Sequence, residues 1–471
     1  MLADELHKEI LAQLPFAPNA LQADLVGRLA LFASGASDTN TFVLNGYAGT
    51  GKTSVGGALI RALARFRHKT VLLAPTGRAA KVAAVMGGGS ASTIHRRIYH
   101  QDPSNGGAVT ISPNRDSNTL FIVDEASLIP DSASVSNSLL LHLVRHILSK
   151  PGNRILFMGD LAQLPPVGQS ESKAMNPQRL AELGLRPETF TLDLPERQQV
   201  GSGILANATN FRYKLFHPEA NHGEPIPIKA TDYPDVEIVS TADLADVLTD
   251  SWSAVGTEET IIVTRSNKRA NNFNTAIRNM VMMAEEPLER GDRLVISKND
   301  YYWSRRNHMK NLLANGETAV VTHVGRAEKM YGRYFSEVDL YIPSEDTEIS
   351  AKLMLRSLIS DGPSVPQEEL NRMYDAAMRQ MAADAASGSA DEPSGLMRLA
   401  DDDPYLNALQ AKYAYCVTCH KAQGGQWRHV YIDMGAIPPD AMTGDFWRWL
   451  YTAVTRATEK VFFINPTLPI N

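Results

Sequence analysis

The chain has 471 residues, a formal net charge of −6, 44 % hydrophobic and 21 % charged residues, which is the composition of an ordinary globular protein. Its length predicts roughly three domains. No apolar run reaches the ~18 residues of a membrane span, the acidic start from Met1 to Glu5 lacks a signal-peptide profile, and two cysteines argue against a disulfide framework. We therefore expect a cytoplasmic protein with no membrane partner.

The negative charge is concentrated in one segment. Residues 345–403 contain 13 acidic and five basic residues, a net charge of −8, so the rest of the chain carries +2. Basic stretches at 61–69 and 95–97 permit a nucleic-acid partner but do not indicate one, because charge runs are usually solvated faces.

The first 40 residues predict two helices separated by Pro15 and Pro18. The second helix begins near Asn19, a favourable N-cap residue. Gln22 falls in its first turn, and taken alone it predicts only an exposed glutamine.

The clearest motif in the chain is Gly46–Thr53, in which two glycines enclose four residues and are followed by Lys and Thr. An apolar strand at 41–44 precedes it and a helical pattern at 55–66 follows it. This arrangement directs backbone N–H groups and a helix N-terminus at phosphate. Lys52 would reach the β- and γ-phosphates, and the Thr53 hydroxyl would ligate Mg2+. A chance glycine loop is the alternative, but all four fixed positions and both flanks agree with the motif.

The next strand, at 71–74, ends in a turn that carries Thr76 and Arg78. This turn is either a contact for a nucleic-acid backbone phosphate or an ordinary connection from a strand to a helix. Residues 98–100 and 108–111 flank a turn with Asn105, Gly106 and Gly107, which is a hairpin signal.

Two further strand ends carry polar side chains suited to nucleotide hydrolysis. Asp124 and Glu125 directly follow an apolar strand at 120–123. Beside a phosphate loop, the first carboxylate is placed to hold Mg2+ and the second to orient and deprotonate water; without that loop the pair would predict a helix cap. Gln163 follows the strand at 155–158 and could reach the γ-phosphate. These apolar runs, alternating with helices, predict a parallel sheet with its site at the carboxyl ends of the strands.

The second half of the chain changes character. We expect a strand at 261–264 and a helix at 271–278, then a small β-barrel-like insert with strands at 291–296, 318–322 and 338–342. A helical pattern at 367–386 leads into a flexible loop at 387–395. The last elements predicted are a strand at 430–432, a helix at 446–458 that carries Arg456, and a strand at 461–464.

Residues Cys416–His420 satisfy the haem-attachment and dithiol patterns. Their alternation predicts a strand rather than the start of a helix, and we interpret the cysteines as partly buried small residues.

Six blocks in this order resemble the superfamily 1 helicases, and the resemblance runs from Gln22 to Arg456. The blocks are Gly46–Thr53, Ala74–Ala80, Val123–Ser127, Gly159–Gly168, Thr418–Gly424 and Leu450–Ala457. Three pieces resemble the 1B branch of RecD-like and Dda-like DNA helicases: Thr93–His95, the Gly159–Pro165 stretch and His420–Gly424. The small insert before Leu120 agrees with this branch.

The resemblance implies an α/β fold with two RecA-like parallel-sheet P-loop NTPase domains and ATP bound between them. The implied domains are residues 1–190, with a pin-type hairpin insert at about 96–118, and 191–292 with 413–471, interrupted by an inserted SH3-like β domain and an acidic helical arm at 293–412. The hairpin would separate strands, although it departs from the family in having no Phe or Trp at its tip, where Tyr99 and His100 are the nearest rings. The arm at 345–403 matches nothing in the family.

The resemblance also implies roles for individual residues. Gln22 would read the adenine edge, Asp124 and Thr53 would hold Mg2+, and the catalytic residues would be Lys52, Glu125, Gln163, Arg197 and Arg456, the last two as arginine fingers. The implied ATP contacts are Gln22, Gly46, Ala48, Gly49, Thr50, Gly51, Lys52, Thr53, Gln163, Arg197, Gly424 and Arg456. The implied DNA contacts are Thr76, Arg78, Thr93, His95, Thr418 and His420, a type of contact that tolerates any sequence.

The resulting hypothesis is an ATP-dependent DNA helicase that translocates 5′→3′ on single-stranded DNA. Its expected partners are single strands, junctions of single- and double-stranded DNA, and proteins of replication, recombination or repair, and we expect a monomer. The polarity follows from the resemblance alone. The alternatives are an RNA helicase of the same superfamily and a DNA-stimulated ATPase switch that does not unwind.

Overall fold

A computed structural model describes residues 2–102, 108–132, 138–194, 201–218, 227–309, 312–387, 400–438, 442–466, 468 and 470. By its internal contacts the chain divides into two compact units. Unit 1 comprises Met1–Ile238 and Ala422–Asn471, and unit 2 comprises Val239–Lys421. Within the described ranges, no helix has the length and apolar character needed to cross a membrane.

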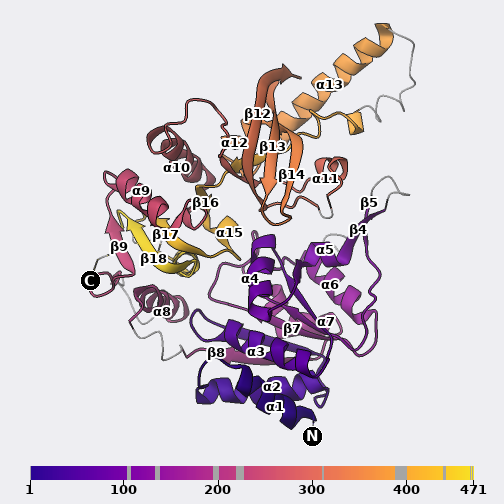
Figure 1. Cartoon of the computed structure of the whole chain (residues 1–471), viewed down its shortest axis with the longest axis vertical. Coiled ribbons are helices and arrows are strands. Elements are labelled where there is room, and N and C mark those ends of the chain that lie inside the picture. The colour runs from indigo at the N-terminus through magenta and orange to yellow at the C-terminus, as the bar shows by residue number, and fades with distance from the viewer. Residues whose placement is uncertain are drawn as a thin grey trace. The chain divides into compact units, whose positions relative to one another are not determined.

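Unit 1 is built on a six-stranded sheet in the order β3-β2-β6-β7-β1-β8. Strands β7 and β8 of this sheet are labelled in Figure 1. The strands are β1 (Thr41–Gly46), β2 (Thr70–Ala74), β3 (Ala91–Thr93), β6 (Leu120–Val123), β7 (Arg154–Gly159) and β8 (Pro187–Leu192). Every pairing is parallel, so the carboxyl ends of all six strands lie along one edge. The α/β fold with a parallel sheet is thereby confirmed.

Helices cover both faces of this sheet because successive strand residues point to opposite sides. Phe42 and Leu44 of β1 pack with α1 (Leu2–Gln13), α2 (Ala20–Ser34) and α3 (Lys52–Arg65). Val43, between them, packs on the other face with α6 (Leu139–Leu148) and α7 (Pro177–Glu182). The uninterrupted apolar strands of the sequence are therefore buried on both faces.

The start of α2 follows the predicted cap. The Asn19 side chain accepts a hydrogen bond from the Gln22 N–H at 2.9 Å, and the Gln22 side chain accepts one from the Asn19 N–H at 3.0 Å. This reciprocal pair is a capping box.

The predicted hairpin is present. The strands β4 (Tyr99–Asp102) and β5 (Ala108–Ile111) pair in antiparallel register, with Tyr99 opposite Ile111. The hairpin follows α5 (Ile94–Ile98) and leads back to β6, and its loop lies outside the described residues. Unit 1 also contains α4 (Gly77–Gly87), α8 (Gly203–Phe216), α16 (Gly444–Val454) and the parallel pair β17 (Trp427–Asp433) and β18 (Ala457–Ile464).

Unit 2 combines a parallel strand pair with an antiparallel sheet. The strands β10 (Thr260–Thr264) and β16 (Cys416–Thr418) pair in parallel. The antiparallel sheet has the order β14-β13-β12-β11-β15 and is formed by β11 (Arg293–Ile296), β12 (Thr318–Met330), β13 (Arg333–Ile342), β14 (Thr347–Met354) and β15 (Ala411–Tyr413). The predicted β insert is therefore present, and its SH3-like character stays a prediction. The remaining elements are β9 (Val236–Val239), at the boundary between the units, and α9 (Leu244–Val255), α10 (Asn267–Met280), α11 (Tyr302–Arg306), α12 (Leu355–Leu358), α13 (Gln367–Ser387) and α15 (Cys419–Ala422).

Three local predictions were wrong. Residues 347–354, expected in a helical arm, form strand β14, which pairs with β13 from Met354 opposite Phe335 to Thr347 opposite Ile342; the long helix is α13. The C-terminal helix ends at Val454, so Arg456 lies in the turn before β18. Cys419 begins the short helix α15 instead of continuing a strand, and both cysteines are fully buried where partial burial was expected.

Candidate nucleotide-hydrolysing site

Three of the predicted catalytic residues, Lys52, Glu125 and Gln163, lie in the segments that follow three adjacent strands. β1 pairs with β7, and β7 pairs with β6 on its other side. The phosphate loop follows β1, Asp160 follows β7, and Asp124 follows β6. Because parallel strands end at the same edge, residues separated by more than a hundred positions come together here.

The phosphate loop has the backbone of an anion-binding turn. Gly49 and Gly51 have left-handed φ values of 73° and 85°, which glycine adopts without strain. The Thr50 hydroxyl donates to the Tyr47 carbonyl at 2.8 Å and closes the turn. Gly51 caps α3 without a side-chain hydrogen bond, so the N–H groups of the first turn remain directed at a ligand.

The two adjacent carboxylates differ in environment. Asp124 is buried, and burial together with the neighbouring Glu125 carboxylate raises its pKa to about 6. Glu125 has a left-handed φ of 51° and ψ of 36°, and its N–H donates to Asp124 Oδ1 at 2.9 Å. Its Oε2 is buried and accepts no hydrogen bond from the described residues. A strained backbone and an unsatisfied acceptor are features of functional sites.

Asp160 and Gln163 complete this side of the site. Asp160 is 2 % exposed, and burial raises its pKa although the Lys52 ammonium opposes the shift. Gln163 Oε1 is buried and, within the described ranges, accepts no hydrogen bond. A buried amide oxygen without a hydrogen-bond donor, on a residue that lines a cavity, is suited to bind a ligand or an attacking water.

The C-terminal segment contacts the loop after β7 through one face of α16. Arg448 donates to the Leu161 carbonyl at 2.5 Å, and Thr452 Oγ1 accepts from the Leu164 N–H at 2.8 Å. Between them, the Tyr451 hydroxyl donates to Asp160 Oδ2 at 2.5 Å.

The turn after α16 holds Arg456. The guanidinium is buried and donates to the Thr452 carbonyl at 3.0 Å and the Gly425 carbonyl at 3.2 Å. Gly424 has a left-handed φ of 69°, and a Cβ there would lie 2.9 Å from Thr76 Oγ1. This glycine therefore lets the 422–427 loop approach the start of α4 closely.

These groups line one cavity of about 780 Å³ in unit 1. The predicted ATP-site residues that line it are Gly46, Ala48, Gly49, Gly51, Lys52, Thr53, Asp124, Glu125, Gln163, Gly424 and Arg456. Tyr47, Asp160, Gln426 and Thr455 line it as well. Arg197 falls outside the described residues. The volume is within the range of small-ligand sites.

Gln22 does not line this cavity. It is 1 % exposed, and besides the capping box its Nε2 donates to the Thr50 carbonyl at 3.0 Å. Its amide thus stabilises the phosphate loop through a residue that does not line the cavity, and its predicted contact with adenine stays a prediction.

The donor set agrees with Mg2+ bound chiefly through a nucleotide. Among the described residues no group of three or more His, Cys, Asp and Glu side chains could hold a metal ion alone. Thr53, Asp124 and Asp160 line the same cavity. Mg2+ usually takes one or two carboxylates together with phosphate oxygens and water, and the residues present fit that requirement.

The predicted DNA contacts are divided between the units. In unit 1, Thr76 caps α4 and Thr93 caps α5 through their hydroxyls, and burial lowers the pKa of His95. The Arg78 guanidinium lies 3.9 Å from the centroid of the Trp427 ring and donates to the Gln426 carbonyl at 2.6 Å. In unit 2, Thr418 ends β16 and His420 lies in α15.

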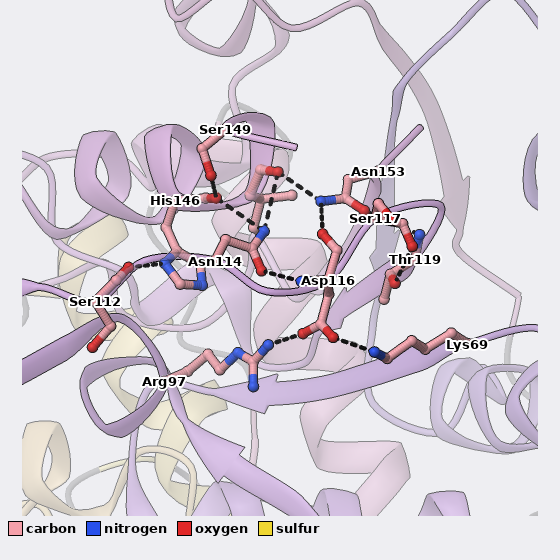
Figure 2. Close-up of polar contacts among 11 residues, drawn as sticks. Lys69, Arg97, Ser112, Asn114, Asp116, Ser117, Thr119, His146, Ser149 and Asn153 are labelled. Carbon is pink, nitrogen blue, oxygen red and sulfur yellow. Dashed lines mark hydrogen bonds and ion pairs between the residues drawn. The ribbon is translucent and has the colours of Figure 1, made fainter. Parts of the chain in front are cut away.

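A polar network fixes the base of the hairpin (Figure 2). Asp116, between β5 and β6, pairs with Arg97 of α5 and with Lys69 before β2. Asn114 Nδ2 donates to the His146 carbonyl at 3.0 Å, and His146 Nδ1 contacts the Ser112 carbonyl at 2.9 Å. The segments that enter and leave the hairpin are thereby joined to α6 and to the sheet.

Sequence reasoning gave no role to Arg448, Tyr451, Thr452 or Asp160. The signal was present in the spacing of the C-terminal helix, where polar positions 448, 451 and 452 recur at i, i+3 and i+4 among apolar residues and therefore share a face. Such a stripe of polar residues indicates a buried polar contact but does not identify the residues that it contacts.

The fold and the site define a P-loop nucleoside triphosphatase of the α/β class. Residues 19–184 match the AAA domain family, and residues 413–464 match the UvrD-like helicase C-terminal domain. The chain is 35 % identical over 126 residues to the ATP-dependent RecD2 DNA helicase of Deinococcus radiodurans. This alignment spans 26 % of the chain and 16 % of that helicase. These matches, like the motif series described above, make the N-terminal and C-terminal parts of the chain similar to ATP-dependent helicases.

Two other similarities cover more of the chain. Protein R530 of Acanthamoeba polyphaga mimivirus is 22 % identical over 400 residues, which is 74 % of this chain and 75 % of that protein. The crystal structure of the Pif1 helicase from Bacteroides in complex with ADP-AlF3 and single-stranded DNA is 15 % identical, with a TM-score of 0.46 over 96 % of this chain and 93 % of that one.

Proposed function

We propose that the chain is an ATP-driven helicase that moves 5′→3′ on single-stranded DNA. The supporting observation is the cavity lined by a phosphate loop, two strand-end carboxylates, a buried arginine and a glutamine whose Oε1 has no hydrogen-bond partner among the described residues. Support for DNA as the substrate comes from the similarity to a RecD2 DNA helicase over 126 residues.

The proposed chemistry assigns one task to each group. Lys52 and the N–H groups of the loop bind the phosphates, while Thr53 and Asp124 hold the Mg2+ that neutralises phosphate charge. Glu125 orients and deprotonates the attacking water, since its free Oε2 is the acceptor available for that proton. Gln163 contacts the γ-phosphate, and Arg456, with Arg197, stabilises the charge of the transition state.

The test is ATP-driven unwinding of duplexes that carry a 5′ or a 3′ single-stranded DNA tail, with matched RNA-tailed duplexes. We expect unwinding from the 5′ DNA tail only, and none by Lys52→Ala, which loses a phosphate ligand while keeping the fold. Unwinding from the 3′ tail would overturn the polarity, and preference for RNA tails would overturn the substrate. DNA-stimulated hydrolysis without strand separation would favour an ATPase switch.

A further inference from the structure

A tyrosine hydroxyl bridges three parts of the nucleotide site. Tyr451 Oη donates to Asp160 Oδ2 at 2.5 Å and accepts from the Ala48 N–H at 2.8 Å. Tyr451 is 1 % exposed and Asp160 is 2 % exposed, so neither contact competes with bulk water. The direction of both bonds follows from chemistry, because the Ala48 N–H can only donate and the hydroxyl has one proton to give.

The three residues come from different elements. Ala48 belongs to the phosphate loop after β1, Asp160 follows β7, and Tyr451 lies on α16. Helix α16 ends three residues after Tyr451, and Arg456 follows in the next turn. The hydroxyl thus ties the segment that carries the arginine to the loop that would hold the phosphates.

Other contacts of α16 do not replace this bridge. Arg448 and Thr452 bind backbone atoms of the loop after β7. Tyr451 is the side chain of this face that reaches beyond Asp160 to the phosphate loop itself. The Tyr47 ring, next to Ala48, is also contacted by α8, because the Arg212 guanidinium lies 4.3 Å from the centroid of the ring.

We propose that Tyr451 is a positioning residue of the nucleotide site. Its hydroxyl fixes the positions of Asp160 and the Arg456 turn relative to the phosphate loop. These positions affect the rate of hydrolysis more strongly than they affect the affinity for nucleotide. This inference rests on the proposed ATPase function. Within the described ranges, Tyr451 forms no hydrogen bond with Lys52 or with the N–H groups of Gly51 and Thr53, the proposed phosphate ligands, which is why affinity is expected to change little.

The test compares Tyr451→Phe with the wild type. The variant keeps the ring that packs in the core and removes only the hydroxyl. Tyr302→Phe is the matched control, because Tyr302 is also buried and its hydroxyl donates to the Asp402 carbonyl at 2.8 Å in unit 2. We expect the single-stranded-DNA-stimulated kcat of Tyr451→Phe to fall about tenfold or more, with KM for ATP and the Kd for ADP within about twofold of wild type.

Amide hydrogen exchange gives a readout that needs no turnover. Tyr451→Phe should accelerate exchange at the Ala48 N–H, and Tyr302→Phe should leave it unchanged. An unchanged kcat with faster Ala48 exchange would show a bridge that hydrolysis does not use and would overturn the proposal. Equal loss of kcat in both variants, or a loss carried by KM alone, would also overturn it. If the wild-type protein bound ADP but hydrolysed no ATP, the proposed function would be wrong. The exchange data would then show separately whether the Tyr451 hydroxyl protects the Ala48 N–H.

Discussion

At the scale of single residues, the site concentrates features that stability alone would disfavour. Glu125 adopts a left-handed backbone conformation, which costs a non-glycine residue roughly 1–2 kcal/mol. Its Oε2 and the Oε1 of Gln163 are buried without partners among the described residues. A fold tolerates strain and unmet hydrogen bonds where a ligand will use them, so we predict that these two residues face the reacting phosphate.

Substitution of Glu125 tests this directly. Glu125→Gln keeps the size and backbone of the residue but removes the base, so hydrolysis should fall about 10²–10⁴-fold while ATP binding persists. Steady-state ATPase rates and binding of a fluorescent ATP analogue measure the two effects. Glu368→Gln, at an exposed position of α13, is the control. A Glu125→Gln enzyme with wild-type turnover would remove the residue from the mechanism.

A second prediction concerns stability in unit 2. Lys412 is 5 % exposed, and burial together with the nearby Lys421 lowers its pKa to about 8. The unfolded chain keeps the ordinary lysine pKa, so the folded state is penalised fully below about pH 8, and the penalty disappears as the pH rises towards the ordinary value. Lys412 donates to the Ser360 carbonyl, which also accepts from Asn271 Nδ2 at 2.6 Å.

Lys412→Met should therefore stabilise the protein at pH 7 by about 1–2 kcal/mol after allowance for solvent screening. The gain over wild type should shrink as the pH approaches 10. Urea unfolding at a series of pH values measures it, with Lys460→Met as a control at a more exposed ion pair with Glu237. A loss of stability at pH 7 would mean that the hydrogen bond outweighs the burial of charge.

At the scale of elements, the strands were more predictable than the ends of the helices. The runs at 120–123 and 155–158 are apolar throughout, and that pattern leaves a buried parallel strand as the simplest solution. The helix predicted to reach 458 instead ends at Val454, because residues 457–464 pair with β17 and this tertiary pairing overrides a weak local preference. Pairing with β13 likewise makes residues 347–354 a strand, β14, in place of the expected helix.

The residues of the site also differed in how far the sequence could predict them. Residues in the segments that follow strands, such as Lys52, Asp124 and Gln163, could be predicted because a motif fixes their place relative to a known element. Tyr451 could not, because its two partners lie 291 and 403 positions away and no spacing in the sequence encodes such a pairing.

The loop at 422–427 gives an element-scale prediction. Gly424→Ala should lower both stability, by roughly 1–3 kcal/mol, and ATP hydrolysis. The new Cβ would lie 2.9 Å from Thr76 Oγ1 and displace Gly424 and Gln426, which line the cavity. Gly184→Ala is the control, since φ there is 84° with no heavy atom within 4 Å of an added Cβ. Thermal unfolding and ATPase assays should show strain in both variants but lost hydrolysis only in Gly424→Ala.

At the scale of the whole molecule, the nucleotide cavity and the hairpin lie in different regions of unit 1. The nucleotide cavity lies at the carboxyl edge of the sheet, whereas the hairpin is held by the network around Asp116 and His146 (Figure 2). Nothing in that network contributes to the lining of the cavity. If the hairpin is the element that parts the duplex, loosening its base should uncouple the two activities.

Asp116→Asn makes this separation measurable. The amide keeps the shape of the side chain but weakens the ion pairs with Arg97 and Lys69, so stability should fall by about 1–3 kcal/mol. Well below the unfolding temperature, DNA-stimulated ATP hydrolysis should persist while unwinding of a 5′-tailed duplex slows. Asp131→Asn is the matched control, because Asp131 is equally buried in unit 1 and pairs with Arg179 at 2.7 Å. If both variants lost hydrolysis and unwinding in parallel, the Asp116 network would serve only to hold the fold, and the strand-separating role would have to be sought away from the hairpin.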